Sequence, residues 1–451
     1  MKDPNSRTDS PKPNLLWIFG DQHRGQALGV AGDPNVHTPN IDNLAREGLY
    51  FRQAVSNNPW CTPFRGSLLT GRYSHDCVWQ TPQRLDPKHR TIADILRAAG
   101  YRSHYIGKWH LGGSNEDHHI PQAERGRFDS WMGYENINNQ YYCSVHGHDE
   151  TGSELEPRRL DGYETEALTD LLIDRLEKET ERMQQGVTDP FFAILSVQPP
   201  HNPYVAPPGF TGRRSPAGIT LRANVPPVER LRDEARVDLA GYYGQIENLD
   251  WNLGRIREAL SRLGLAENTA IMFFSDHGDM HLSHGMREKS SPWEESIRIP
   301  FIIGGEIPFG ERRAGPVDAL LGATDILPTT LGLCGVDKPD DLPGFDFSAY
   351  RWAAEDTPLR NEPESAYVQH VVRKMHPGSI DRPWRGVVTR DGWKYACMPG
   401  APLCMYNLNE DPYETHNMIF QRRYLTERTE LQSLLAEWIA STGDDFELPE
   451  L

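Results

Sequence analysis

The chain has 451 residues, 25% of them charged, and a formal net charge of −17. This composition excludes a small disulfide scaffold and a low-complexity chain, and it predicts a globular protein of about two or three domains. So acidic a balance argues against nucleic acid as a partner, because a phosphate-binding face is basic. The longest apolar run near the start, Leu15–Phe19, is too short for a membrane span or a signal-peptide core.

Those observations predict no membrane partner. They also predict a cytoplasmic protein, or a periplasmic or secreted one if a targeting segment has been removed. The first 14 residues are polar and interrupted by proline, so we expect a loose tail. The oligomeric state is not readable from the sequence.

Short apolar runs bounded by turn residues predict strands that are buried on both faces. They lie at 14–20, 191–197, 269–275 and 299–305, and a further strand is predicted at 101–106. Strands of this kind, separated by amphipathic helices, are typical of a parallel sheet.

Helical patterns fill the intervals between these strands. Predicted helices lie at 41–48 with Asn40 as the cap, at 91–100 with a capping box of Thr91 and Asp94, at 164–178, and up to Gly264. The fold class is therefore α/β: a large, mostly parallel mixed sheet sandwiched by helices.

A stretch rich in proline and aspartate at 337–363 marks the best candidate for a domain boundary. We expect a larger N-terminal domain, 1–360, that carries the chemistry. We also expect a smaller C-terminal α+β subdomain, 361–451, with a short antiparallel sheet, a terminal helix around 427–441 and a share in the substrate pocket.

Polar residues directly follow the first and the third of the buried strands. They are Asp21 and Gln22 in one place and Asp276 and His277 in the other. Since ligands gather at the carboxyl ends of parallel strands, these groups could hold one hard divalent cation, calcium or magnesium. Taken alone, Asp21-Gln22 is better explained as a turn or a helix cap, and the second pair shifts the balance toward metal.

The segment NPWCTPFRGSLLTGRY raises a second site. Pro63 suits the first turn of a helix, so Cys61 is expected just ahead of a helix N-terminus that favours an anion. Arg65 could fix that anion. A thiolate phosphatase is excluded, because its arginine would stand where Ser67 is found. The alternative is a buried cysteine beside a capping turn.

Three further segments carry cationic or titratable side chains. In an extended GKWH segment, Lys108 and His110 would project to the same side, one fixing an anion and the other moving a proton. His201 follows the strand at 191–197, and Lys289 lies shortly after the Asp276-His277 pair.

Here the sequence resembles a family. CTPFR followed by LTG resembles the signature of the sulfatases at the cysteine that becomes formylglycine, and GYRSHYIGKWH (100–110) resembles their second signature. Further resemblances occur in the same order along the chain: DQ (21–22), TPNIDNLAREG (38–48), PPHNP (199–203), SDHGDMHLSHG (275–285), EESIRIP (294–300), ATDILPTTLGLCG (323–335) and YNLNEDPYETHNM (406–418). The resemblance implies the fold of the alkaline-phosphatase superfamily and a formylglycine-dependent sulfatase that hydrolyses a sulfate monoester.

The resemblance also implies roles. Formylglycine, made from Cys61, would be the nucleophile in the form of its gem-diol, and Arg65 and Lys108 would orient it. His201 and Lys289 would bind the sulfate and help to protonate the leaving oxygen. His110 would take a proton from the second hydroxyl and so release the sulfate. The implied metal, calcium with magnesium as the alternative, would be held by Asp21, Gln22, residue 61, Asp276 and His277. The implied partners are a sulfated small molecule or saccharide and a formylglycine-generating enzyme.

Two departures from the family pattern concern the metal ligands. Many sulfatases have a second aspartate where Gln22 stands, and many have asparagine where His277 stands, so the metal shell here carries less negative charge. Two other readings compete. A phosphonate monoester hydrolase or phosphodiesterase of the same superfamily tends to lack the GK-x-H motif that Lys108 and His110 supply. An inactive binding protein would result if Cys61 stayed a thiol.

The organic part of the substrate is less constrained. Candidates for an outer pocket are Trp60, His23, Arg24 and the segment 370–385, which includes Trp384. These residue types would suit a sugar ring that bears further anionic groups. The alternative is that they pack the small C-terminal sheet against the main domain.

Overall fold

A computed structural model describes residues 12–306, 313–352, 358–374 and 378–450. Most of the predicted N-terminal tail, residues 1–11, lies outside this part. Among the described residues, no helix is both long and apolar enough to cross a membrane.

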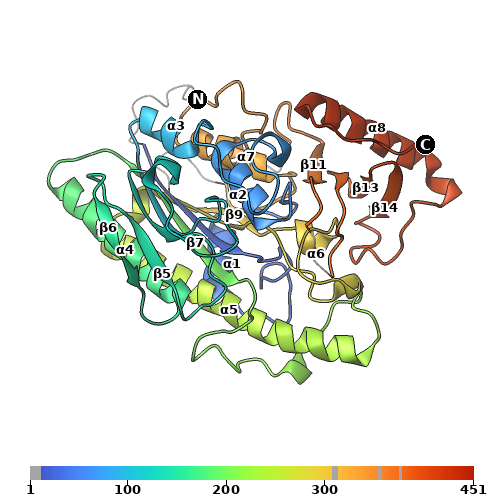
Figure 1. The fold of residues 1–451 in the computed structure, drawn as a ribbon, viewed down its shortest axis with the longest axis horizontal. Coiled ribbons are helices and arrows are strands. Elements are labelled where there is room, and N and C mark those ends of the chain that lie inside the picture. Colours follow the sequence, from blue (N-terminus) through green and yellow to red (C-terminus); the bar gives the residue numbers. More distant parts are fainter. Residues whose placement is uncertain (1–11, 307–312, 353–357, 375–377, 451) are drawn as a thin grey trace.

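A ten-stranded sheet forms the centre of the molecule (Figure 1). Its spatial order is β10 (Gly315–Val317), β2 (Leu49–Phe51), β9 (Phe301–Gly305), β8 (Thr269–Ser275), β1 (Asn14–Asp21), β7 (Phe191–Pro200), β3 (Arg102–Lys108), β4 (Ser130–Tyr134), β5 (Ser144–His148) and β6 (Glu154–Arg159). The five strands from β8 to β4 run parallel, and β9, β5 and β6 join antiparallel. The predicted mixed, mostly parallel sheet is confirmed.

Strand β1 shows why the sheet is covered on both faces. Its side chains alternate: Trp17 and Phe19 enter one apolar cluster, while Leu16 and Ile18 enter another. All four are at most 1% exposed. Helices α2, α3 and α7 contribute to the first cluster and α1, α4 and α5 to the second. Fully burying each such side chain contributes about 1.5–3 kcal/mol, so this central strand is held firmly in register.

The α-helices have these bounds: α1 Pro39–Glu47, α2 Cys61–Thr70, α3 Ile92–Ala98, α4 Glu164–Gln184, α5 Glu229–Arg262, α6 Glu294–Ile297, α7 Ala323–Leu333 and α8 Leu425–Thr442. The capping box of Thr91 and Asp94 is confirmed. Asn40 as a cap is wrong: α1 begins at Pro39 with Thr38 in the cap position, because the fixed φ of proline suits the first turn.

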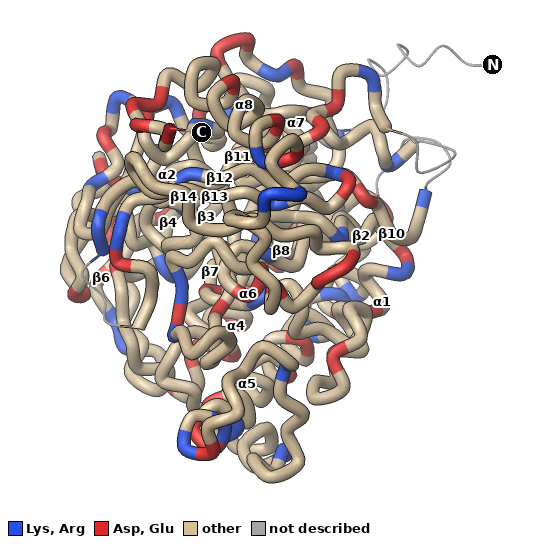
Figure 2. Tube along the Cα trace, turned by 90° about the vertical axis from the view of Figure 1, so that its right-hand side faces the viewer, with Lys and Arg blue, Asp and Glu red and all other residues tan. Residues whose placement is uncertain are grey.

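The C-terminal part forms an antiparallel sheet of β11 (Ser365–His370), β12 (Trp384–Thr389), β13 (Trp393–Met398) and β14 (Ala401–Asn407), as predicted. One face of this sheet packs on Ile297 and Leu320 of the larger part, and the other packs on α8. Figure 1 shows this sheet and α8 at one end of the molecule. The boundary between 360 and 361 stays a prediction. On the face drawn in Figure 2, acidic and basic residues are interspersed.

Candidate active site

The carboxyl ends of β1 and β8 bring two pairs of polar residues together. Gly20 lies opposite Ser275 in the parallel ladder, so Asp21 and Asp276 leave the sheet side by side. Gln22 has a φ of 72°, and its backbone N–H donates to Asp276 Oδ1 at 2.9 Å. A left-handed residue directly after the strand turns the chain sharply and keeps both acidic groups at the edge of the sheet.

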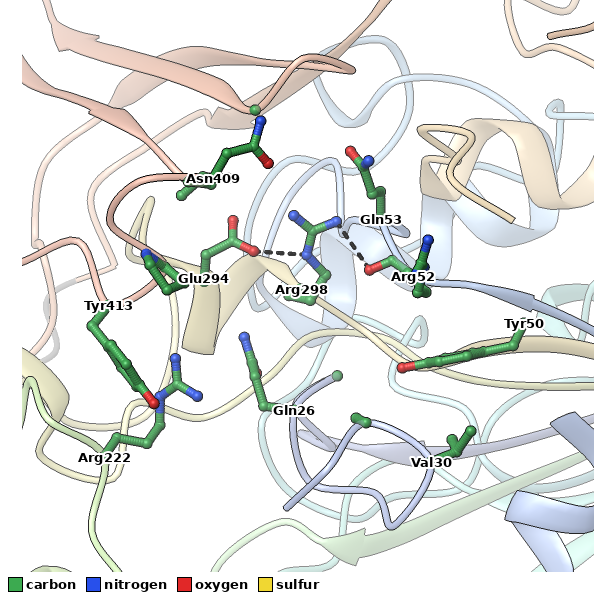
Figure 3. A pocket seen from close by; sticks show the side chains of 15 residues that line it. Gln26, Val30, Tyr50, Arg52, Gln53, Arg222, Glu294, Arg298, Asn409 and Tyr413 are labelled. Atoms are coloured by element: carbon green, nitrogen blue, oxygen red, sulfur yellow. Dashed lines mark hydrogen bonds and ion pairs between the residues drawn. The ribbon is translucent and has the colours of Figure 1, made fainter. Parts of the chain in front are cut away.

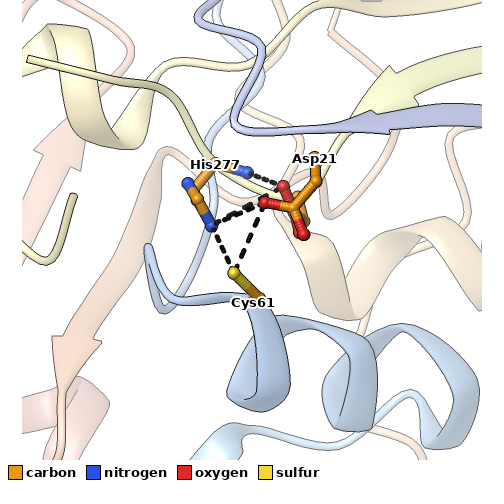
Figure 4. A group of neighbouring side chains, drawn as sticks. Asp21, Cys61 and His277 are labelled. Atoms are coloured by element: carbon orange, nitrogen blue, oxygen red, sulfur yellow. Dashed lines mark hydrogen bonds and ion pairs between the residues drawn. The ribbon is translucent and has the colours of Figure 1, made fainter. Parts of the chain in front are cut away.

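Helix α2 delivers the cysteine to the same place. Cys61 is the first residue of the helix, with Trp60 in the cap position, so it does not lie ahead of the helix as the sequence suggested. The Cys61 Sγ atom lies 3.4 Å from Asp21 Oδ1 and 3.1 Å from His277 Nε2 (Figure 4). Donor atoms of Asp21, Cys61, Asp276 and His277 all lie within 4.8 Å of one another, and all four residues are buried.

Two cations hold the acidic side of this cluster. Lys108 Nζ donates to Asp21 Oδ2 at 2.7 Å. Arg65 Nη2 lies 3.2 Å from Asp21 Oδ2 and 3.5 Å from Asp276 Oδ2. The other guanidinium nitrogen, Nη1, donates to the hydroxyl of Ser196 and to the Lys108 carbonyl, each at 2.8 Å. Arg65 is thus fixed from two sides and faces the cluster with one nitrogen.

Lys289 and His201 close the opposite side. Lys289 Nζ lies 3.3 Å from Cys61 Sγ, 2.9 Å from His201 Nε2 and 2.5 Å from Gln22 Oε1. His201 follows β7, and its Nδ1 lies 2.7 Å from the Asn202 carbonyl, which leaves Nε2 toward the site. The sulfur of Cys61 is therefore bordered by carboxylate and imidazole on one side and by ammonium on the other.

Burial and charge set the ionisation of these groups. Burial alone would raise the pKa of Asp21, but Lys108, His201 and Lys289 hold it well below its usual value. Burial and the neighbouring Asp21 charge raise the pKa of Asp276 to about 6. Burial lowers the pKa of His277 to about 4, so the imidazole is neutral near neutral pH and offers a lone pair. Two carboxyl groups beside a neutral imidazole suit a cation bound between them.

His110 reaches the site in a different way from the one predicted. Strand β3 ends at Lys108, and His110 has a φ of 55°. The segment is therefore not extended at His110, and the prediction that its side chain follows the alternation of a strand is wrong. Its backbone N–H donates to the Glu135 carbonyl at 2.9 Å. Its buried ring nitrogens have no hydrogen-bond partner among the described residues. Burial, Lys108 and Arg65 lower its pKa well below the usual value, so the imidazole is neutral and can accept a proton.

The donor set fits a divalent metal. Two carboxylates, one imidazole and the residue at 61 converge from three elements. The set becomes oxygen-rich, as calcium and magnesium prefer, when residue 61 offers oxygen in place of sulfur. Two other groups of the described residues have similar spacing, His104–Glu150–Glu179 and His284–Glu295–Glu414. Neither includes Cys61 or the residues at the carboxyl ends of β1 and β8.

The outer-pocket candidates behave mostly as packing residues. Trp384 is fully buried in the C-terminal sheet, and its Nε1–H donates to the Ser290 carbonyl at 2.9 Å. His23 and Arg24 are buried beside the metal pair and bond to Ala27 and Tyr243. All three side chains pack and bond within the protein, which is the alternative that the sequence left open. Residues 375–377 of the proposed segment lie outside the described residues.

Trp60 and Lys374 do lie near the nucleophile. Lys374 Nζ lies 5.9 Å from the centre of the Trp60 ring and 3.5 Å from Glu288. Burial and the neighbouring Lys289 lower the pKa of Lys374 to about 8. This corner of the site is where the C-terminal part approaches the catalytic residues.

A larger cavity lies elsewhere. It has a volume of about 530 Å³ and is lined by Arg52, Arg222, Arg298 and Glu294 among others (Figure 3). Its arginines pair with Asp318, Glu295 and Glu294. None of the clustered residues around Cys61 lines it, and none of its lining residues flanks His201 or Lys289 in the chain, so we do not assign the substrate to it.

Two residues in the neighbourhood of the cluster were missed by the sequence analysis. Ser196 lies within β7 and holds Arg65. Asp279 accepts from the Gln22 side-chain amide at 2.5 Å. Asp279 stands two residues after His277, in the SDHGD stretch, and this closeness to a predicted ligand could have identified it. Nothing in the sequence around Ser196 could have done so, because only the register of the strands places it beside Arg65.

A cysteine at a helix start beside acidic groups at parallel strand ends, in this α/β fold, is the arrangement of a hydrolase of the alkaline-phosphatase superfamily. The family model described as Sulfatase matches residues 13–336, and the chain belongs to the sulfatase family. It is therefore a sulfuric ester hydrolase.

The relatives support this assignment over the full length. An ulvan-active sulfatase of Formosa agariphila is 33% identical over 99% of this chain and 84% of its own length. An N-acetylglucosamine-6-O-sulfatase of Bacteroides thetaiotaomicron is 23% identical over 96% of this chain and 87% of its own length. The crystal structure of yidJ from Bacteroides fragilis, assigned to the sulfatases, is 26% identical, has a TM-score of 0.83 and covers 98% of this chain and 99% of that one.

Proposed function

We propose that the chain hydrolyses a sulfate monoester of a carbohydrate with formylglycine, made from Cys61, as the nucleophile. The observation that carries the proposal is the position of Cys61 Sγ, 3.1 Å from His277 Nε2 and 3.3 Å from Lys289 Nζ. The sulfur marks where the oxygens of the hydrated aldehyde would lie. The sugar in the substrate is supported by the names of relatives that act on ulvan or on N-acetylglucosamine sulfate.

In the first step, one hydroxyl of the gem-diol attacks sulfur and the S–O bond to the alcohol breaks. Lys289 binds the sulfate, and the Lys289–His201 pair supplies the proton that the leaving oxygen takes. The ammonium is the member of the pair that carries this proton, because burial and Lys289 hold the pKa of His201 well below its usual value. Lys289 and His201 lie in contact, so binding and protonation occur at one point. Arg65 and Lys108 orient residue 61 through the Asp21 carboxylate that they share.

In the second step, His110 takes the proton of the remaining hydroxyl. The carbonyl re-forms, the C–O bond to the sulfate breaks, and inorganic sulfate leaves; addition of water then restores the diol. The neutral, unpartnered imidazole of His110 suits this transfer, since nothing among the described residues occupies its nitrogens.

The metal proposed for this site is calcium, with magnesium as the alternative, held by Asp21, Gln22, residue 61, Asp276 and His277. When bound, it lowers the pKa of the nucleophile and polarises the sulfate oxygens. The Gln22 amide gives the shell one negative charge fewer than an aspartate there would give, and the neutral His277 adds none. A formylglycine-generating enzyme is the proposed partner that matures Cys61.

The test is the mass of the peptide that contains residue 61, from protein coexpressed with a formylglycine-generating enzyme. We expect an aldehyde in place of the thiol, trapped by a hydrazide, together with turnover of 4-nitrophenyl sulfate. Cys61→Ala should lower turnover by about 10⁴-fold or more, whereas Cys77→Ala, at a buried cysteine outside the cluster, should retain it.

Two results would contradict the proposal. An intact thiol at residue 61 under these conditions would contradict the formylglycine mechanism and favour an inactive binding protein. Faster hydrolysis of a 4-nitrophenyl phosphonate monoester than of the sulfate would point to a phosphonate monoester hydrolase.

A further inference from the structure

A small polar cavity lies beside the candidate catalytic residues. Its volume is about 180 Å³. It is lined by Asn202, Tyr204, Asp238, Asp279, His281, Leu282, Arg287 and Glu288. These residues come from the loop after β7, from α5 and from the segment between β8 and α6.

The cavity adjoins the reacting centre from three directions. Asn202 follows His201, and Glu288 precedes Lys289. Asp279 Oδ2 accepts from Gln22 Nε2 and from the Tyr204 hydroxyl, each at 2.5 Å. A leaving group that is protonated by the Lys289–His201 pair would therefore lie next to this space.

The charge of the lining is acidic. Asp238, Asp279 and Glu288 supply carboxylates, and the single cation among the lining residues, Arg287, pairs with Glu234. Glu288 also lies 3.5 Å from Lys374. An anionic substituent brought into this space would face carboxylates, whereas a hydroxyl would donate to them.

Two lining side chains have unused hydrogen-bonding capacity. His281 is 4% exposed, and its ring packs against Tyr204 and Tyr242 with centroids 4.8 and 4.3 Å away. Its Nε2 lies 3.4 Å from Asp279 Oδ2, and its Nδ1 is buried without a hydrogen-bond partner among the described residues. Burial lowers the pKa of His281 to about 4, so the ring is neutral and, with Nε2–H facing Asp279, keeps Nδ1 as an acceptor. Asp238 is half-buried and has no hydrogen bond or ion pair with another described residue.

We propose that this cavity receives the sugar ring of the leaving group, through Asp238 and His281, and selects an uncharged, hydroxyl-rich ring over one that carries a carboxylate. The inference rests on the proposed function and names its substrate class more narrowly. It also replaces the expectation, drawn from the arginines and histidines of the segment 370–385, that the sugar bears further anionic groups.

The test compares two matched sets of esters with protein that carries formylglycine. One set is methyl galactoside and methyl glucoside sulfated singly at O2, O3 or O4; the other is the corresponding uronosides, which differ only by the carboxylate at C6. We expect the wild type to hydrolyse at least one neutral ester at least tenfold faster, in kcat/KM, than its uronoside. Asp238→Asn should reduce that ratio by about tenfold, the effect of one hydrogen bond to a charged acceptor.

The matched control is Asp233→Asn on the same helix. Asp233 is 67% exposed and pairs with Arg236, so the ratio should stay unchanged. A wild-type preference for the uronosides would overturn the inference, as would equal effects of the two aspartate variants. Turnover of 4-nitrophenyl sulfate with none of the neutral sugar esters would overturn it too.

Failure of the proposed function has a separate signature, no turnover of 4-nitrophenyl sulfate by protein with a verified aldehyde at residue 61. The cavity is then tested by ligand-observed NMR of methyl galactoside and methyl glucoside with the unmatured protein. Binding that Asp238→Asn and His281→Ala both weaken supports the inference. No binding, or binding that neither variant changes, overturns it.

Discussion

Two buried clusters of charge in this protein have opposite characters. Around Cys61, Asp21 and Asp276 converge on a shared point with a neutral imidazole, and His110 has ring nitrogens without partners. At the base of α6, Lys394 Nζ lies 2.7 Å from Glu294 and 2.6 Å from Glu414, and Arg298 lies 2.7 Å from Glu294.

Carboxylates and cations pair with one another in both clusters, so burial of charge alone does not mark a reactive site in this fold. The first cluster differs because it holds a cysteine at the start of a helix, 3.1 Å from a neutral imidazole. His110 also brings ring nitrogens that no described residue binds. Variants in the two clusters and around them should therefore separate loss of activity from loss of stability.

The largest expected effect is on turnover, from His110→Asn. Asparagine tolerates the positive φ of this position, so the backbone should be kept. We expect kcat to fall by about 10²–10⁴-fold, because a proton acceptor is lost. The sulfated enzyme should accumulate and be detectable by intact mass. The free energy of unfolding, measured in urea, should change by less than about 1 kcal/mol, and a larger loss would show that His110 is structural.

The next effect is on stability, from Lys394→Met. Removing the lysine leaves Glu294 and Glu414 buried without it, which should cost about 3–5 kcal/mol in the free energy of unfolding. The activity of each folded molecule should stay the same. Lys88→Met is the control, since Lys88 is 91% exposed and lies 3.9 Å from Asp86. Equal losses in the free energy of unfolding for the two variants would show that Lys394 does not stabilise Glu294 and Glu414.

A smaller effect concerns pH. Burial raises the pKa of Glu164 to about 7, although Tyr134 and the Gln198 N–H donate to it. The folded pKa exceeds the unfolded one, so the contribution to stability is full below about pH 4.5 and is lost as pH rises through about 7. Glu164→Gln keeps an acceptor for both donors and should remove this loss, about 3 kcal/mol, so that the free energy of unfolding depends less on pH. An unchanged dependence on pH would contradict the raised pKa.

The smallest effect is the response to metal. Calcium at about 100 times its Kd should stabilise the folded protein by about 2.7 kcal/mol, read as a rise in Tm over protein in a chelator. Asp276→Asn should abolish the rise, because a carboxylate of the donor set is lost. Asp318→Asn, at an exposed ion pair with Arg52, should retain it. A rise of equal size in both variants would place the metal elsewhere.

The sequence was most informative where local pattern decides structure. Continuous apolar runs identified the parallel strands, and polar residues just after them identified Asp21 and Asp276, because strand ends of a parallel sheet meet at one edge. Long-range packing decided the rest. The orientation of His110 depends on its positive φ, and Trp384 is buried where β12 packs against the larger part of the molecule. Asp238 lines the small polar cavity because α5 spans 34 residues, and the sequence analysis set no N-terminal limit for this helix.

Every residue of α2 is buried, and Cys61 is 2% exposed. An enzyme that acts on Cys61 would need α2 out of the core, so modification would compete in time with folding during synthesis. A chain that folds first would keep its thiol for as long as it stays folded. The active fraction of a preparation would then depend on the relative rates of modification and folding. Slower synthesis or more modifying enzyme would raise this fraction without any change in the sequence.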